Sequence, residues 1–291
     1  MISGIALVDK PWGISSHTAV AQARRALGTK KVGHAGTLDP AATGLLVLGV
    51  GPGTRLLTFV VGADKTYEAT VRLGYATTTD DAEGEALPPT GDIGSVSEES
   101  VRAAAAALVG EIEQVPSTYS AIKVDGKRAY DLARSGQEVE LKSRRVTIRS
   151  LELGEITRGD GVLDVHIRVE CSSGTYIRAI ARDIGDALGV GGHLIALRRD
   201  VVGPFERKDA VAAEELTEAH LLSLGDVARR ILPSVTVGED DARHLRHGRA
   251  VDVSAWPADT PVAAVSESTG ELVAIVQASA GKSRILMGVA G

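Results

Sequence analysis

Two stretches of the chain alternate hydrophobic and polar residues strictly, a pattern that predicts strands with one buried face. The first spans residues 65–75 and places four apolar residues on one face: Tyr67, Ala69, Val71 and Leu73. The second spans residues 163–171 and places five there: Leu163, Val165, Ile167, Val169 and Cys171. We therefore expect a sheet with one face in the core and one face in water.

Other stretches predict buried strands and amphipathic helices. Residues 44–50 are apolar without interruption and lie between glycines, which is typical of a buried strand, and residues 5–8 form a shorter one. Helices are expected over residues 19–27, 54–61, 98–109 and 177–188. Ser15 or Ser16 is the candidate N-cap of the first, and Ser97 that of the third. The succession of strands and helices predicts a mixed α/β core.

The pattern changes near residue 233, where we place a domain boundary. The following residues predict a strand, a short helix that ends at Gly248, another strand, and then a hairpin that turns at Thr269 and Gly270. We therefore expect a large domain over residues 1–232 and a small β domain over residues 233–291.

Composition narrows the class of protein. No apolar segment approaches the length of a membrane span, and the N-terminus lacks the basic lead of a secretory signal. Cys171 is the single cysteine, which excludes an internal disulfide and a cysteine-rich zinc site. We expect a protein of the reducing cytoplasm, with no membrane partner.

The net charge of −6 argues against a nucleic-acid partner, but the charges are segregated along the chain. Residues 1–63 carry six Lys and Arg against two Asp and Glu, a balance of +4. Residues 120–149 carry eight against four, again +4, whereas residues 64–100 carry two against nine, a balance of −7. Two basic segments on one face would suit a phosphate backbone, although solvated surfaces show similar segregation.

The stretch from residue 32 to residue 49 holds the strongest candidate for chemistry. Between residues 33 and 44 it gathers three glycines and a histidine around Asp39, which precedes Pro40 and then the apolar run. A carboxylate on a rigid turn beside a core strand could present a nucleophile. The alternative is that Asp39 is only a helix N-cap or a turn former.

A family resemblance favours the nucleophile. The run GHAGTLDPAATGLL at residues 33–46 resembles the catalytic motif of the tRNA pseudouridine synthase B (TruB) family, G-H-x-G-x-L-D-P-x-A-x-G, at every fixed position. The resemblance implies that Asp39 is the nucleophile. It also implies that His34 occupies the space that the target base leaves.

Three further segments resemble motifs of the same family in the same order. Residues 64–67 (DKTY) imply that Tyr67 contacts the base. The alternative for Tyr67 is half-buried packing with its hydroxyl in water. The string CSSGTYIR at residues 171–178 implies that Tyr176 contacts the base and that Arg178 pairs with Asp39. The alternative for Arg178 is a charge on a helix surface. The string GGHLIALRR at residues 191–199 implies a hydrophobic wall at Leu197.

Several basic residues are candidates for contact with RNA. DKPWGISS at residues 9–16 resembles the first family motif, and we favour a structural turn there that Lys10 supports from near the site. Residues 120–149 resemble an insertion that clamps RNA in the family, while an exposed basic helix explains the same residues equally well. The candidate RNA contacts are Lys10, Lys123, Lys127, Arg128, Arg198 and Arg199.

Together the motifs imply a stand-alone enzyme that isomerises the uridine at position 55 in the T loop of tRNA to pseudouridine by base flipping. The implied fold is a mixed-sheet pseudouridine synthase core of α/β (α+β) type with a small C-terminal β-barrel, a PUA-like domain. We expect a monomer that uses no cofactor, no metal and no guide RNA. The two rivals are an RNA-folding protein on the same scaffold and a guide-dependent enzyme that acts on ribosomal RNA, whose relatives usually carry longer basic tails.

Overall fold

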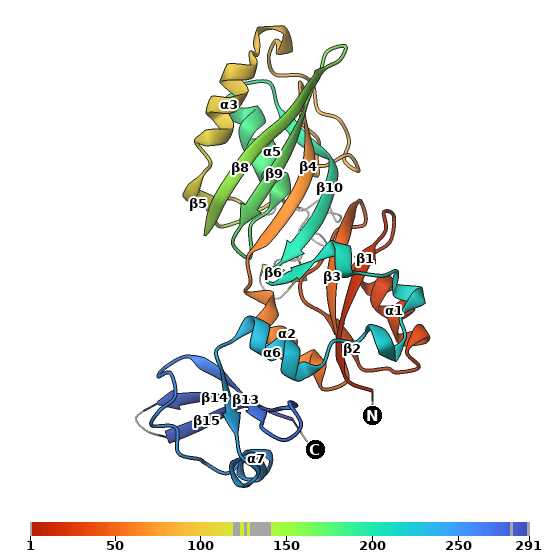
Figure 1. Cartoon of the computed structure of the whole chain (residues 1–291). Helices are drawn as coiled ribbons and strands as arrows, with labels where there is room; N and C mark the ends of the chain where they lie inside the picture. The colour runs from red at the N-terminus through yellow and green to blue at the C-terminus, as the bar shows by residue number, and fades with distance from the viewer. Residues whose placement is uncertain (1, 119–122, 125–126, 129–140, 280–281, 290–291) are drawn as a thin grey trace. The chain divides into compact units, whose positions relative to one another are not determined.

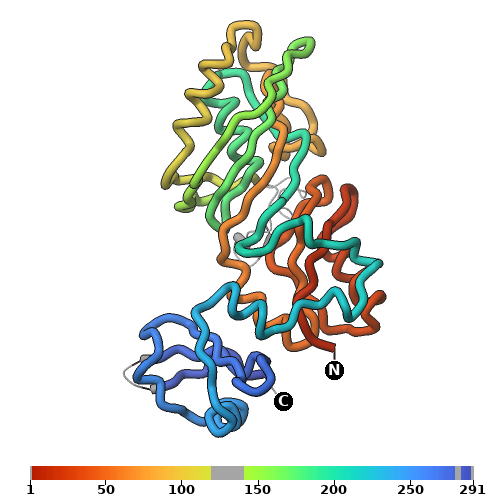
Figure 2. Tube along the Cα trace, in the orientation of Figure 1, coloured from red at the N-terminus to blue at the C-terminus, as the bar shows by residue number. Residues whose placement is uncertain are grey.

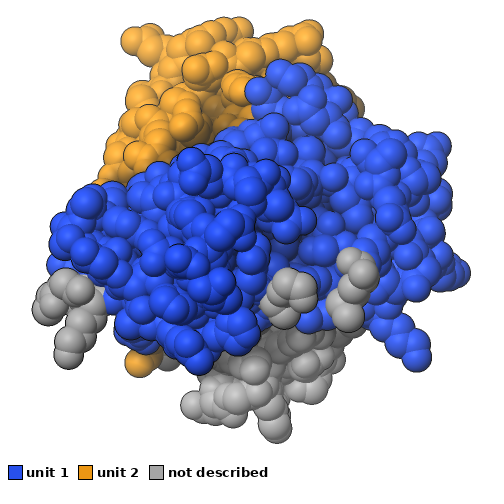
Figure 3. All heavy atoms as spheres, turned by 60° about the horizontal axis from the view of Figure 1, so that its bottom comes forward, with its two compact units in different colours: residues 1–39, 44–62, 202–291 blue, residues 40–43, 63–201 orange. Residues whose placement is uncertain are grey.

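The structure is a computed structural model, and it describes residues 2–118, 123–124, 127–128, 141–279 and 282–289. The chain divides into two compact units. Unit 1 holds residues 1–39, 44–62 and 202–291, and unit 2 holds residues 40–43 and 63–201 (Figure 3). The chain thus passes between the units four times, first at the peptide bond between Asp39 and Pro40.

Unit 2 is built on five strands in the order β10-β4-β9-β8-β5 (Figure 1). Their bounds are β4 Lys65–Leu73, β5 Gly110–Gln114, β8 Arg144–Arg158, β9 Leu163–Cys171 and β10 Gly192–Val202. The pairs β4/β9, β8/β9 and β5/β8 are antiparallel. The long hairpin of β8 and β9 can be followed in Figure 2.

Two helices, α3 (Glu98–Ala106) and α5 (Ile177–Ala187), cover one face of this sheet. The apolar residues of β4 and β9 point into the core beneath these helices, which confirms both alternating strands. The opposite face is charged: Arg72 pairs with Asp164 and Arg168 with Glu68, each at 2.6 Å. One apolar and one ionic face give a two-layer unit.

The main sheet of unit 1 has β3 (Ala42–Val50) paired with both β1 (Gly4–Lys10) and β2 (Val32–His34). Strand β3 is buried on both faces, as its apolar run predicts. Its residues alternate between a core under α1 (Ser16–Ala26) and a core under α2 (Gly53–Val61) and α6 (Leu224–Ile231). Ser15, rather than Ser16, caps α1.

The C-terminal part of unit 1 is a four-stranded sheet in the order β12-β13-β14-β15. Its elements are β12 Ser234–Val237, α7 Glu239–Arg246, β13 Pro261–Ser266, β14 Leu272–Ser279 and β15 Lys282–Gly288. One face packs on α6 and the other on α7. The hairpin at Gly270, whose φ is +72°, is confirmed. The strand expected directly after Gly248 is wrong, since within residues 251–253 only Asp252 forms a bridge, and that bridge is isolated.

The remaining elements are short strands and 3₁₀ turns. They are β6 Lys123–Val124, β7 Lys127–Arg128, β11 Phe205–Glu206 and the 3₁₀ turns η1 Ile93–Ser95, η2 Arg207–Asp209, η3 Ala213–Glu215 and η4 Glu218–His220. Ser97 caps α3 as predicted, but the helix ends at Ala106 instead of continuing to residue 109. None of the helices in the described part of the chain is long and apolar enough to cross a membrane.

Candidate functional site

Asp39 lies on the loop that joins β2 to β3 and is half-buried. The buried hydroxyl of Ser16 fixes this loop: it accepts from the Leu38 backbone N–H at 2.8 Å and donates to the Leu38 carbonyl at 3.0 Å. Gly36 and Gly44 flank the loop with φ of +103° and +99°, values that residues other than glycine rarely adopt. The carboxylate is therefore presented by ordered backbone.

His34, at the end of β2, is also half-buried. Its ring meets the ring of His17 edge-to-face, with centroids 5.7 Å apart. His17 belongs to the first turn of α1, next to Ser16. The start of α1, the end of β2 and the Asp39 loop therefore form one connected part of unit 1.

Lys10 is fully buried, and its ammonium donates to the carbonyls of Pro11 and Ile14 at 2.9 and 2.8 Å. The expected structural role in the turn is confirmed. The side chain has no exposed surface in this structure, and its expected contact with RNA stays a prediction.

In unit 2, Tyr176 is the N-cap residue of α5, and both its backbone N–H and its carbonyl are hydrogen-bonded. The buried amide of Gln114 accepts from its N–H at 2.8 Å and donates to its carbonyl at 3.2 Å. The Arg144 guanidinium lies 5.7 Å from the centre of the Tyr176 ring. Sequence reasoning missed Gln114, whose signal is a polar residue that ends the alternating strand β5.

Arg178 is buried in the first turn of α5, 6% exposed, which rules out a surface charge. Its Nη1 lies 3.2 Å from the Asp81 carboxylate and donates to the Thr79 carbonyl at 3.0 Å. One turn later, Arg182 pairs with Asp80 at 3.3 Å. The acidic loop after β4 is thus the partner of α5, a role that the sequence analysis did not anticipate. The signal available was the run of threonines and aspartates at residues 77–81.

Tyr67 is 7% exposed on β4, and Leu197 is half-buried on the neighbouring strand β10. The Leu197 carbonyl accepts from the Thr43 hydroxyl at 3.4 Å. Of the predicted site residues, unit 2 therefore contains Tyr67, Tyr176, Arg178 and Leu197, and unit 1 contains Asp39 and His34.

Strands β4 and β10 also carry one buried cation each, Lys65 on β4 and Arg199 on β10. Burial, with a smaller contribution from the Arg199 charge, lowers the pKa of Lys65 to about 8. Arg199 is 1% exposed, and its expected contact with RNA stays a prediction. Its neighbour Arg198 is exposed and pairs with Asp200 at 2.8 Å. Contact between Arg198 and RNA stays a prediction.

The basic segment at residues 120–149 is described only in part. Strands β6 and β7 pair antiparallel, with Lys123 opposite Arg128 and Val124 opposite Lys127. Lys123–Val124 and Lys127–Arg128 therefore form a strand pair. Arg134, a further basic residue of this segment, lies outside the described residues, and the alternative of an exposed basic helix stays open there.

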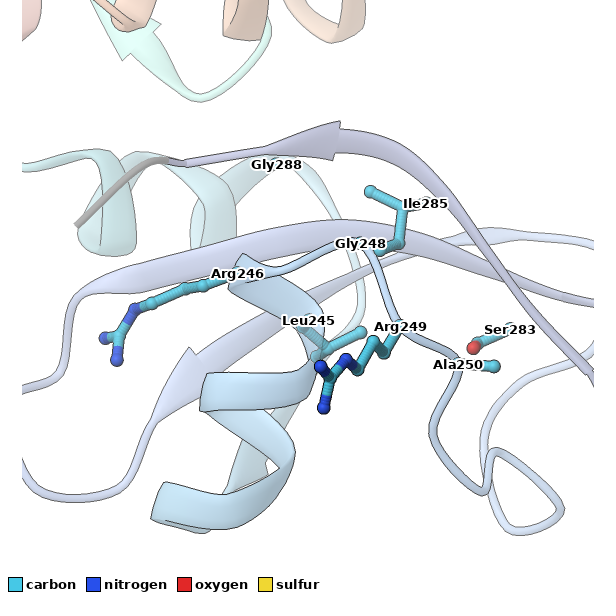
Figure 4. A pocket seen from close by; sticks show the side chains of 8 residues that line it. All are labelled: Leu245, Arg246, Gly248, Arg249, Ala250, Ser283, Ile285 and Gly288. Atoms are coloured by element: carbon cyan, nitrogen blue, oxygen red, sulfur yellow. The ribbon is translucent and has the colours of Figure 1, made fainter.

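A cavity of about 390 Å³ lies on the C-terminal sheet (Figure 4). Arg246 and Arg249 line it from the end of α7 and the following loop, opposite Ser283 and Ile285 of β15. Within the ranges that the structure describes, no three His, Cys, Asp or Glu side chains are grouped as a metal requires.

Replacing Asp81 with asparagine tests the buried ion pair. Asp81→Asn leaves a buried cation beside a neutral group, so we expect the free energy of unfolding to fall by about 3 kcal/mol in a urea titration. The control Glu83→Gln removes a charge from the exposed part of the same loop and should cost less than about 0.5 kcal/mol. Equal losses in the two variants would contradict the role of the pair.

Lys65 predicts a pH dependence of stability. Because its folded pKa of about 8 lies below the unfolded value of 10.5, the unfolded chain binds more protons between these values. The cost of burying the charge is therefore complete below about pH 8 and is relieved as the pH rises toward 10.5. We expect the native protein to gain roughly 1–2 kcal/mol relative to Lys65→Met from about pH 7.5 to about pH 9.5. A constant difference between the two proteins would refute the shifted titration.

The sequence is similar to known proteins over nearly its whole length. A model described as "TruB family pseudouridylate synthase (N terminal domain)" matches residues 24–177, and one described as "tRNA pseudouridylate synthase B C-terminal domain" matches residues 178–235. The chain is 50% identical to the tRNA pseudouridine synthase B of Arthrobacter sp. (strain FB24), over 98% of this chain and 95% of that protein. It is 49% identical to the protein of the same name from Leifsonia xyli subsp. xyli (strain CTCB07), over 98% and 96%.

Solved structures share the fold. A chain in the crystal structure of a Cbf5-Nop10-Gar1 complex superposes with a TM-score of 0.72 at 26% identity, covering 99% of this chain and 84% of that one. A chain of an archaeal box H/ACA sRNP Nop10-Cbf5 complex gives 0.72 at 25%, covering 98% and 85%. Since a family model matches more than half of the sequence and close relatives match nearly all of it, the chain belongs to the TruB family of pseudouridylate synthases.

Proposed function

We propose that this pseudouridine synthase isomerises the uridine at position 55, in the T loop of tRNA, with Asp39 as the nucleophile. The observation that carries the proposal is the complete motif at residues 33–44, whose aspartate lies on a loop clamped at Leu38. The relatives that share half of the residues are named tRNA pseudouridine synthase B, which supports tRNA as the substrate.

The proposed isomerisation of uridine requires a carboxylate nucleophile and no redox step. The N1–C1′ bond of uridine breaks, the uracil turns, and a C5–C1′ bond forms. C5 loses a proton and N1 gains one, so the product is an isomer of the substrate. Because neither electrons nor water are consumed, the proposal includes no cofactor. Asp39 carries the covalent intermediate, a role that carboxylates fill in other enzymes.

The uridine must leave its stack before Asp39 can reach it, which costs a few kcal/mol. In our proposal Tyr67 and Tyr176 hold the flipped base, Leu197 forms an apolar wall, and Arg178 pairs with Asp39. His34 fills the space that the base leaves in the loop, a stacking role that histidine plays with RNA elsewhere. The burial of Tyr67 and the fixed peptide of Tyr176 support this assignment, because both rings project from rigid strands or helix ends.

The rest of the tRNA requires a wider grip. We propose that residues 233–291 form a PUA-like barrel domain beside a catalytic domain over residues 1–232, and that this domain contacts the tRNA. The cavity with Arg246 and Arg249 supports the idea, since guanidinium groups suit phosphate. Lys123, Lys127, Arg128 and Arg198 would contact the backbone of the T arm and so supply affinity without reading sequence. The enzyme would act as a monomer and without a guide RNA.

The direct test compares the native protein with Asp39→Asn on an unmodified tRNA transcript, with no other RNA present. We expect pseudouridine at position 55 with the native protein, and at least a 10⁴-fold lower rate in the variant because no nucleophile remains. The measurement is site-specific mapping of pseudouridine together with tRNA binding, with a chelator present.

The outcomes separate the alternatives. Equal conversion by both proteins would reduce Asp39 to a structural residue. Binding without conversion by the native protein would favour an RNA-folding role. Conversion only after a second RNA is added would favour a guide-dependent enzyme.

A further inference from the structure

The turn after β1 displays an exposed tryptophan. Among the large hydrophobic side chains of the described residues, Trp12 is the most exposed, at 71%. The chain has only two tryptophans, and the other, Trp256, packs against the core of the C-terminal sheet. A large aromatic ring left in water is informative when the backbone that carries it is rigid, because a rigid ring is ready to receive a partner.

The backbone of this turn is held from below. The fully buried ammonium of Lys10 donates to the carbonyls on both sides of the tip, those of Pro11 and Ile14. Gly13 supplies the left-handed step, with φ of +85°, and Pro11 restricts its own φ. Burying a lysine is costly unless its charge is hydrogen-bonded, so the fold commits a buried cation to fixing the turn that carries Trp12.

The same turn leads directly to the Asp39 loop. It ends at Ser15, the N-cap of α1, and the next residue, Ser16, makes both hydrogen bonds to Leu38. His17 follows and meets the ring of His34. Trp12 therefore belongs to the part of unit 1 that presents the proposed nucleophile, within a segment whose charge balance is +4 over residues 1–63.

We propose that Trp12 is a stacking platform for an unpaired nucleobase of the RNA substrate, next to the uridine that reacts. The inference rests on the proposed function, which requires RNA at the Asp39 loop. An indole face stacks on any base and binds it without reading its sequence. An unpaired base is the fitting occupant because flipping one nucleotide out of a loop exposes the faces of its neighbours.

The decisive experiment uses Trp12 as its own reporter. In the full-length Asp39→Asn, Trp256→Phe protein, Trp12 is the only tryptophan. We expect its fluorescence to be quenched in a saturable way when an unmodified T-arm RNA hairpin is added, and to become protected from acrylamide. RNA binding without any change in fluorescence or acrylamide access would overturn the proposal. A fluorescence change that follows protein concentration without RNA would assign the ring to contact with a second copy and would also overturn it.

Affinity provides an independent readout. Trp12→Ala should weaken binding of the hairpin about 5- to 150-fold, the range of one aromatic stack, while Trp12→Phe retains most of the affinity. The slope of affinity against salt concentration should stay unchanged, because no phosphate contact is removed. Trp256→Phe alone is the control and should bind as the native protein does. Unchanged affinity in Trp12→Ala, or a shallower salt slope, would contradict stacking.

The two proposals fail separately. Pseudouridine formation by the native protein with no effect of Trp12→Ala would remove only the stacking platform. Quenching of Trp12 by RNA, together with a native protein that makes no pseudouridine, would keep the platform and remove the proposed function.

Discussion

The buried guanidinium of Arg178 is the constraint on which the site of unit 2 depends. A charge removed from water costs several kcal/mol unless charged and polar partners surround it. Asp81 and the Thr79 carbonyl provide such partners, and they come from a loop rich in threonine and aspartate. The loop in turn bonds to β10, where the Leu194 N–H donates to the Asp80 carbonyl at 3.0 Å. The position of α5, and with it Tyr176, therefore follows from satisfying one charge.

Unit 1 achieves the same order by packing. Strand β3 is apolar and buried on both faces, so its register against β1 and β2 is fixed by two cores at once. The loop before it inherits that order, and Ser16 anchors it at Leu38. Asp39 thus needs no secondary structure of its own. It lies where the chain leaves unit 1 for unit 2, so the motif that carries it joins the two units covalently.

Much of this could be predicted because its signals are local. Alternation at residues 163–171 fixed the bounds of β9, and an uninterrupted apolar run located β3. The resemblance of residues 33–46 to the TruB motif is confirmed by the family matches, while the roles of Asp39 and its companions stay predictions. The roles of Asp81 and Gln114 were missed because they depend on partners 97 and 62 residues away, and no spacing in the sequence reports such pairs. The burial of Lys10 and Arg199 was not anticipated for a related reason: basic residues usually lie at the surface, and only tertiary structure shows that these are buried.

Our central proposal is that Asp39 and Arg178 act on the same uridine. A double-mutant cycle on single-turnover rates with unmodified tRNA tests it most directly, using the conservative changes Asp39→Glu and Arg178→Lys, which keep the charge of each side chain. If the two side chains serve one step, their effects are coupled, and the double variant should be slower than Asp39→Glu by much less than the factor that Arg178→Lys costs alone. Losses that simply multiply would mean that the two residues act independently, and would contradict the account.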